Sequence, residues 1–338
     1  MNLKYMDMHC DTITTLYNRV KENQDSGQNL KRNNLQLDIE RMAKAGYLLQ
    51  NFAVFLNQRK CSNLYEEAMK RIQFFKEQLF LYKKELVQVT SYEEILENEK
   101  KGVMSALLTL EGGEILEGNV DNLYEFYKQG VRMITLTWNY ENELGHPNFD
   151  MNKYLQSGAA KPDLTGRDTE NGLTDFGIEV VREMERLHML VDVSHGSDQL
   201  FWDVIHYGKE PFVASHSNAK TIHNCSRNLT DEMIMALANR GGVMGMNFCA
   251  DFVSDRCGRE QMTYAEDMVR HMVHIKKIAG TDCIGLGSDY DGIDNQLEWK
   301  DAGGMEILYH EMREQGFTER ECDRILGENV LRIYEERL

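Results

Sequence analysis

The sequence predicts a (β/α)8 barrel in a single domain that spans residues 1–338. Eight short apolar runs recur along the chain, and segments with a helical period lie between most of them. Neither an internal repeat nor a proline-rich linker divides the chain, which has three prolines. Buried apolar strands that alternate with helices form a parallel sheet, and eight such units close a barrel.

The expected strands, in chain order, lie at residues 5–9, 48–56, 103–111, 131–137, 189–195, 211–216, 242–248 and 283–289. Helical periods with polar outer faces predict helices at residues 65–86, 175–188 and 265–279, and Thr174 is the expected N-cap of the second. The connection 139–174 is long for a compact domain, which is typical of functional loops, and we expect it to lie over the active site.

Composition narrows the classes of partner. The net charge of −17 disfavours nucleic acid and anionic membranes, so small solutes are the expected ligands. The N-terminus predicts no signal peptide, and no stretch approaches the roughly 18 apolar residues of a membrane span, which together predict a cytoplasmic protein. Seven scattered cysteines without a CxxC pair predict reduced thiols. A homodimer stays open, because no interface signal is visible.

Histidines and acids occur where the predicted strands end. In a parallel barrel the loops that leave these ends converge on one pocket. Six such residues lie at or just past five of the ends, and they are His9, Asp11, Glu111, His195, His216 and Asp289. Histidine nitrogen and carboxylate oxygen suit zinc, and also manganese or iron. Two metals sharing Glu111 as a bridge, with a water or hydroxide between them, would use the whole set.

Each of these residues alone is more often a satisfied polar group than a ligand. Their joint placement at strand ends is what favours a metal site. By contrast, His271 and His274 lie in a charged amphipathic segment, which predicts a solvated helix face.

With these residues in hand, the chain resembles the membrane dipeptidase (renal dipeptidase, peptidase M19) family nearly end to end. The motifs that carry the resemblance are "DMHCDT", "LEGGE", "RMITLTWNYENELG", "NGLTDFG", "VDVSH", "PFVASHSNAK", "SRNLTDE", "GGVMGMNF", "IGLGSDYDG" and "ILGENVLRIY". The resemblance implies two Zn²⁺ per chain, with His9 and Asp11 on one, His195 and His216 on the other, and Glu111 bridging them.

The resemblance also implies roles around the metals. Asp289, beside the first metal, would handle a proton, and Arg227 would pair with the substrate carboxylate. Trp138 stands where the animal enzymes have a substrate-binding histidine, and Phe252 where they have a tyrosine. Both changes are expected to alter substrate preference, and the first resembles bacterial branches of the family.

The implied activity is zinc-dependent hydrolysis of small dipeptides by a hydroxide that bridges the metals, with a D-residue at the C-terminal side among the substrates left open. Two alternatives remain. Trp138 motivates a two-metal hydrolase of another small amide, such as a lactam, a cyclic amide or an N-acyl amino acid. A non-catalytic barrel that binds metal or peptide is the other alternative.

Overall fold

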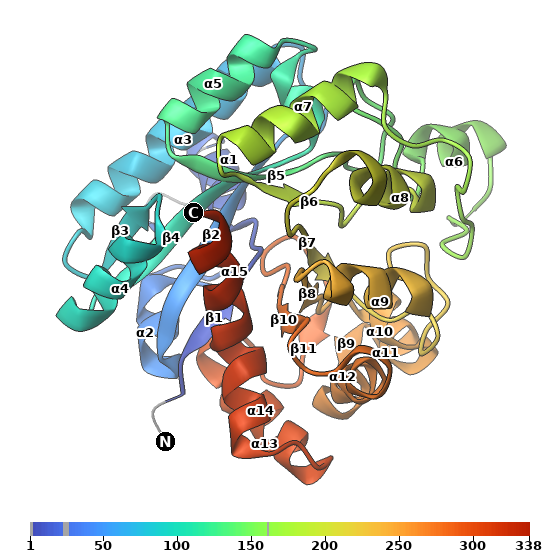
Figure 1. Ribbon diagram of the computed structural model, residues 1–338. Coiled ribbons are helices and arrows are strands. Elements are labelled where there is room, and N and C mark those ends of the chain that lie inside the picture. Colours follow the sequence, from blue (N-terminus) through green and yellow to red (C-terminus); the bar gives the residue numbers. More distant parts are fainter. Residues whose placement is uncertain (1–2, 23–26, 161) are drawn as a thin grey trace.

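The computed structural model describes residues 3–22, 27–160 and 162–338, and a parallel sheet forms its centre (Figure 1). Residue 161 of the predicted loop 139–174 lies outside the described residues. The strands are β1 (Tyr5–Asp7), β2 (Tyr47–Phe55), β3 (Leu86–Val89), β4 (Met104–Glu111), β5 (Val131–Thr135), β6 (Leu190–Asp192), β7 (Val213–Ser217), β8 (Val243–Met246), β9 (Met262–Thr263), β10 (Ile284–Leu286) and β11 (Gln296–Leu297).

Strand pairing closes the barrel. Within the described ranges the order is β2, β1, β10, β8, β7, β6, β5, β4, β3, and β2 also pairs with β4. This second pairing leaves β3 outside and joins the other eight strands of the sheet into a ring, which confirms the predicted (β/α)8 barrel. β9 and β11 form a separate two-stranded sheet.

The described part of the chain also forms helices, most of which lie outside the ring of strands (Figure 1). They are α1 (Thr12–Lys21), α2 (Ile39–Ala45), α3 (Leu64–Leu81), α4 (Tyr92–Lys101), α5 (Val120–Lys128), α6 (Met151–Ser157), α7 (Asp175–Arg186), α8 (Asp198–Tyr207), α9 (Asp231–Asn239), α10 (Ala250–Val253), α11 (Asp255–Glu260), α12 (Ala265–Ala279), α13 (Glu306–Glu314), α14 (Glu319–Asp323), α15 (Asn329–Arg337), the 3-10 turns η1 (Gly113–Leu116) and η2 (Ala302–Gly304), and the π turn η3 (Arg324–Glu328). Thr174 caps α7 as predicted, because its side chain accepts a hydrogen bond from the Gly177 amide. No helix in the described part of the chain is long and apolar enough to cross a membrane.

Each predicted run overlaps one strand of the barrel, but β3 was not predicted. The sequence predicts one helix over residues 65–86, whereas α3 ends at Leu81 and β3 starts at Leu86. The chain turns at Tyr82, whose carbonyl accepts from the amides of Glu85 and Leu86. The polar segment before Leu86 favours a helix locally, and pairing of the next four residues with β4 overrides that preference.

Two apolar layers pack on the two faces of the sheet. The outer layer lies between strands and helices, and the inner layer fills the barrel with side chains such as Met6, Leu107 and Val213. Ile333 and Tyr334 of α15 join the inner layer, so that α15 covers the amino ends of the strands. The carboxyl ends are therefore the end at which a site can form.

The prediction for His271 is wrong. Its side chain is 0% exposed, because it lies on the face of α12 that also buries Met268 and Met272. The ring accepts a hydrogen bond from the Ala219 amide at Nδ1, and its Nε2 lies 2.8 Å from the Val253 carbonyl oxygen. The many charged residues of this segment suggested exposure to solvent, although one face of the amphipathic helix is buried.

The connection 139–174 contains α6 and contacts the carboxyl ends of two strands. The amide of Asn148 donates to the His195 carbonyl at 2.8 Å, just past β6. Further on, the Leu164 carbonyl accepts from the Ser226 amide at 2.5 Å, in the segment after β7. The loop is therefore held beside the strand ends at two points.

Candidate active site

The six predicted site residues converge at the carboxyl ends of five strands. Glu111 is the last residue of β4 and His216 lies in β7. The others lie just past β1, β6 and β10, and they are His9, Asp11, His195 and Asp289. The sequence expectation that these residues meet at one mouth therefore agrees with their positions in the structure.

Glu111 occupies the middle of this cluster. Its Oε1 lies 3.1 Å from His195 Nε2 and 3.5 Å from His216 Nε2. Its Oε2 lies 3.7 Å from His9 Nε2. The two oxygens of one carboxylate thus face two different sets of nitrogen ligands, which is the arrangement of a bridging ligand.

The remaining ligands fall into two sets, which we name by their strands. The first ligand group, from β1 and β10, consists of His9, Asp11 and Asp289, with His9 Nε2 at 3.5 Å from Asp11 Oδ2 and 3.9 Å from Asp289 Oδ1. The second ligand group, from β6 and β7, consists of His195 and His216, whose Nε2 atoms lie 3.0 Å apart. Donor atoms of His9, Glu111 and His216, and those of the first ligand group, are each close enough to hold one ion.

Burial sets the ionisation of the carboxylates. It raises the pKa of Glu111 well above its ordinary value and that of Asp289 to about 6. Burial alone would lower the pKa of His9, but Glu111, Asp11 and Asp289 raise it to about 10. Three acids therefore share one imidazolium, and a bound cation would supply the positive charge that the cluster lacks.

The second ligand group is neutral. Burial, followed by the positive charges of Arg227 and His9, lowers the pKa values of His195 and His216 far below the ordinary histidine range. The Nδ1–H of His195 donates to Asn139 Oδ1 at 2.9 Å, so its Nε2 carries a lone pair. Two such lone pairs that face each other are favourable when a cation lies between them.

Buried donor atoms that lack hydrogen-bond partners in the described part of the chain also indicate that the cluster can bind a metal. His9 Nδ1 and Nε2 and Asp11 Oδ1 are buried and have no hydrogen-bond partner among the described residues. Buried polar atoms normally find a partner, so these atoms indicate a missing one. Histidine and carboxylate ligands with no cysteine at the cluster suit zinc or a similar divalent ion.

A buried carboxylate orients the second ligand group. Asp192, at the end of β6, accepts hydrogen bonds from the hydroxyls of Thr135, Ser194 and Ser215 at 2.5–2.6 Å. Because the Ser215 hydroxyl donates its proton to Asp192, it accepts a hydrogen bond from His216 Nδ1–H at 2.8 Å. This relay fixes the tautomer that leaves Nε2 of His216 free for a metal.

The first ligand group is held more loosely. Asn247 Nδ2 donates to Asp289 Oδ2 at 3.1 Å. Asp289 and Asp291 both adopt positive φ angles of 61° and 69°, which non-glycine residues rarely do. A Cβ on Gly292 would lie 2.2 Å from Asp11 Oδ2 and 2.4 Å from Asp289 Oδ1, so a side chain there would force both carboxylates to move.

The supporting residues Asp192, Ser215, Asn139 and Asn247 were not predicted. One signal was present in the sequence for Asp192, because a carboxylate within an otherwise apolar run has to be compensated inside the barrel. The other three lie within one residue of a predicted ligand or of Trp138, or inside a predicted run, and their hydrogen bonds could not be inferred without the three-dimensional arrangement.

The cluster opens into a cavity of about 720 Å³. Trp138 and Phe252, predicted as substrate-binding residues, both line it, and the Trp138 ring lies 4.7 Å from that of Phe55. Arg227 lies deeper and is 2% exposed. Its guanidinium donates to the carbonyls of Ser194 and His216, and its Cζ lies 5.4 Å from the centre of the Phe252 ring.

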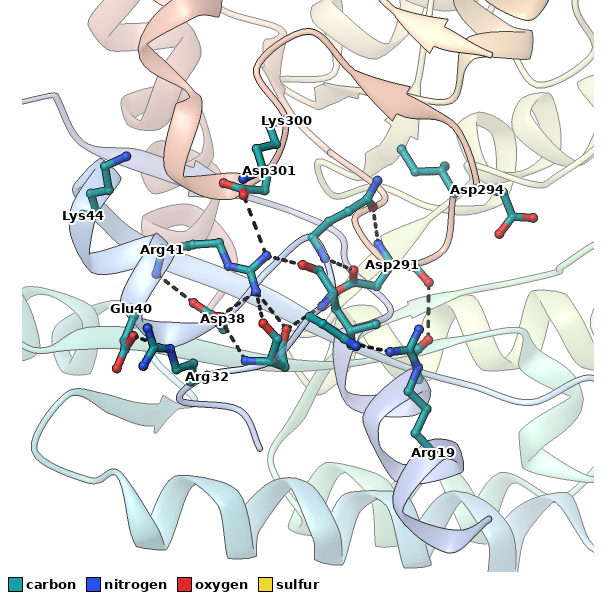
Figure 2. A pocket seen from close by; sticks show the side chains of 16 residues that line it. Arg19, Arg32, Asp38, Glu40, Arg41, Lys44, Asp291, Asp294, Lys300 and Asp301 are labelled. Carbon is teal, nitrogen blue, oxygen red and sulfur yellow. Dashed lines mark hydrogen bonds and ion pairs between the residues drawn. The ribbon is translucent and has the colours of Figure 1, made fainter. Parts of the chain in front are cut away.

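A second basin of about 1100 Å³ adjoins this cavity, between α1, α2 and residues 291–301 (Figure 2). Arg41 lies at its centre, 2.6 Å from Asp38 and 3.9 Å from Asp301. Asp291 forms part of the wall between the two cavities, where it accepts from Thr12 Oγ1 at 2.5 Å. The ion pair between Arg41 and Asp301 links α2 to the residue that precedes η2.

Comparison with known proteins places the chain in a family. Residues 1–337 match the model of the membrane dipeptidase family, peptidase family M19. A protein of Klebsiella pneumoniae from the pqqA 5' region is 35% identical over 231 residues, which are 68% of this chain and 81% of that protein. An uncharacterized dipeptidase of Schizosaccharomyces pombe is 33% identical over 237 residues, which are 70% of this chain and 53% of that protein.

Solved structures share the whole fold. Dipeptidase AC, a metallopeptidase of family M19, has a TM-score of 0.88 at 25% identity and covers 100% of this chain and 99% of its own. A metallopeptidase from Rhodobacter sphaeroides, liganded with a phosphinate mimic of the dipeptide L-Ala-D-Ala, has a TM-score of 0.87 at 24% identity and covers 100% of both chains.

The barrel and its buried donor cluster define the class of protein, a metal-dependent hydrolase. Within that class the family match is specific. The chain belongs to the membrane dipeptidase family, peptidase family M19, and is a metallo-dipeptidase.

Proposed function

We propose that the protein hydrolyses dipeptides with a free carboxylate, that it uses two zinc ions per chain, and that a D-residue is accepted at the C-terminal side. The observation that carries the metal pair is the position of Glu111, whose two oxygens face His195 and His216 on one side and His9 on the other. His9 and Asp11 would hold one ion, and His195 and His216 the other.

When bound, the metal pair supplies Lewis acidity, which activates water and polarises the scissile carbonyl. Asp289 would take the proton of the attacking water at Oδ1 and return it to the leaving amine. Two features support this role: Asn247 holds Oδ2 of Asp289, and Oδ1 faces the cluster at 3.9 Å from His9 Nε2.

Arg227 would bind the substrate carboxylate. Its Nε has no hydrogen-bond partner within the described residues, and each terminal nitrogen donates to one carbonyl and so keeps a second proton for the substrate. Contact with the Phe252 ring fixes the guanidinium plane, which favours bidentate binding of a carboxylate. Arg227→Met should raise KM for dipeptides more than it lowers kcat.

We further propose that the connection 139–174 limits the cavity to short substrates, because its contacts with the segments after β6 and β7 hold it at the mouth. Replacing residues 151–165 by a short Gly-Ser linker tests this. The variant should gain activity on tripeptides, and unchanged rejection of tripeptides would contradict the role.

The central experiment combines metal analysis of the purified protein with amino-acid release from a dipeptide library that includes D-residue members. We expect about two zinc ions per chain and turnover of dipeptides that Asp289→Asn abolishes. Turnover of lactams or N-acyl amino acids in place of dipeptides would favour the other amide substrates. Tight dipeptide binding without release, unaffected by Asp289→Asn, would indicate a binding protein instead.

A further inference from the structure

The charges around the active-site cavity are unevenly distributed. Six carboxylates line it, and Lys60 is the one lysine or arginine among the lining residues that the structure describes. We propose that Lys60 binds a carboxylate on the side chain of the N-terminal residue of the substrate, so that dipeptides beginning with Glu or Asp are preferred. This inference rests on the proposed dipeptidase function.

The loop after β2 directs Lys60 toward the cavity. Gln58 Nε2 donates to the Glu141 carbonyl at 3.2 Å, and Arg59 Nη2 donates to Asn152 Oδ1 at 2.5 Å. Arg59 also lies over the Tyr140 ring, with its Cζ 5.7 Å from the ring centre. These two neighbours are thus tied to the 139–174 connection, while Lys60 reaches the cavity with its ammonium free of any hydrogen bond or ion pair to the described residues.

Lys60 and Arg227 lie on opposite sides of the mouth. Around the ring the strands follow the order β1, β2, β4, β5, β6, β7, β8, β10, so that β2 and β7 are four strands apart in a ring of eight. Lys60 follows β2 and Arg227 follows β7. A dipeptide whose C-terminal carboxylate lies at Arg227, and whose peptide bond lies at the ligand cluster, extends its N-terminal residue toward Lys60.

The lining near Lys60 suits an acidic side chain with an aliphatic stem. Phe55, the last residue of β2, and Trp138 line the same cavity and offer apolar ring surface with their ring centres 4.7 Å apart, and Lys60 adds a compact positive charge to this lining. The rim between Lys60 and Arg227, on the side of β10 and β8, has the opposite charge, because Asp251 and Asp294 follow β8 and β10. The structure therefore predicts a preference that depends on position: an acidic residue is favoured first in the dipeptide and not second.

The test compares the isosteric pairs Glu-Ala with Gln-Ala and Ala-Glu with Ala-Gln on the metal-loaded enzyme, since each pair differs in charge and hardly in shape. We expect wild type to cleave Glu-Ala with kcat/KM about two- to fivefold above Gln-Ala, mainly through KM. Lys60→Met should reduce this ratio to about one, while Lys101→Met, the matched control at an exposed lysine of α4 outside the cavity lining, keeps it. Neither variant should change the ratio for Ala-Glu and Ala-Gln.

Charge reversal gives a second, independent measurement. Lys60→Glu should prefer Lys-Ala over Gln-Ala, a gain that damage to the fold could not produce. An unchanged Glu-Ala to Gln-Ala ratio in Lys60→Met, or the same loss in Lys101→Met, overturns the inference while dipeptide hydrolysis itself stands. Absence of turnover of every dipeptide in wild type would instead overturn the proposed function on which it rests.

Discussion

The two ligand groups of the active site differ in how the chain supports them. In the second ligand group, both imidazoles donate through Nδ1, His195 to Asn139 and His216 to Ser215, and Asp192 anchors Ser215 in turn. In the first ligand group, both ring nitrogens of His9 and Oδ1 of Asp11 lack a hydrogen-bond partner among the residues described. One half is oriented by its own hydrogen bonds, and the other is not.

This difference shows what determines the geometry of each ligand group. Hydrogen bonds that fix the histidine tautomer preorganise the second ligand group before any ion arrives. In the first ligand group the backbone places the three side chains, and Asn247 donates a hydrogen bond to Asp289. Gly292, which has no side chain, leaves room for the carboxylates of Asp11 and Asp289. We therefore expect the bound cation to complete the order of the first ligand group, and the second to keep its geometry without it.

The largest effect should come from Glu111, which serves both groups. Glu111→Gln removes the charge that faces His9 on one side and His195 on the other, so both ions should be lost. We expect kcat/KM to fall by more than about 10³-fold, beyond the 10- to 100-fold typical of residues that only support ligands. Elemental analysis should show the loss of metal.

Glu114→Gln is the matched control for this variant. Glu114 is also buried, and burial raises its pKa to about 7, but its carboxylate accepts from Asn142 and lies outside the ligand cluster. It should retain both metal and activity. Loss of metal in both variants would show that any buried acid in this segment matters, and would remove the special role of Glu111.

Gly292→Ala tests the first ligand group alone. The added methyl would lie within 2.4 Å of oxygens of both Asp11 and Asp289, so both carboxylates must move. A displacement of about 1 Å in a catalytic group can cost about 10²-fold in rate, and we expect a fall of that size in kcat. Crystallography should show His195 and His216 in place. Full activity in this variant would contradict the dependence of the first group on close packing.

The sequence predicted more of the ligands than of their supports. Parallel strands bring their carboxyl ends together, so the positions of His9, Glu111 and His216 at the ends of apolar runs were enough to group them. The sequence did not predict β3. The polar residues before Leu86 favour a helix locally, and pairing with β4 overrides that preference.

The supports depend on distances that a linear pattern does not contain. Ser215 precedes His216 in the chain, yet its role follows from a hydrogen bond to Asp192 on the neighbouring strand. His271 shows the converse error, because charged neighbours in its segment suggested solvent exposure although its own position faces the core. Side-chain direction, and not residue type, separates these cases.

Ser215→Ala tests the preorganisation of the second ligand group. Without the hydroxyl, His216 Nδ1–H loses its acceptor and the ring is free to change tautomer or orientation. We expect kcat/KM to fall about tenfold, and the affinity for one of two metal ions to fall by a similar factor, at the weak end of outer-ligand effects. Metal titration by calorimetry measures the second quantity.

Ser217→Ala is the control, since its buried hydroxyl lies on the same strand and has no hydrogen-bond partner in the described ranges. It should bind both ions as wild type does. Equal losses in the two serine variants would mean that the strand, and not the relay from Asp192, orients His216.

The smallest effect concerns the metal-free protein, in which the two groups should respond to acid with opposite signs. His216 has a lowered pKa and stays neutral when folded, whereas unfolded histidine binds a proton below about pH 6.5, so this group loses stability as the pH falls. Burial raises the pKa of Asp289 to about 6. Its contribution to the free energy of unfolding is therefore complete below the pKa of about 4 in the unfolded chain, and is lost as the pH rises through 6.

Urea unfolding in a chelator at pH 7 and pH 5 separates the two contributions. His216→Gln should reduce the acid loss of unfolding free energy by about 1–2 kcal/mol, because the variant removes a proton that only the unfolded chain binds. Asp289→Asn should deepen the acid loss, since it removes a proton that the folded chain binds first. If His216→Gln and Asp289→Asn shift the pH dependence of the unfolding free energy in the same direction, the two ligand groups do not differ in ionisation. The contrast between a neutral, preorganised second group and a charged first group that depends on its cation would then not hold.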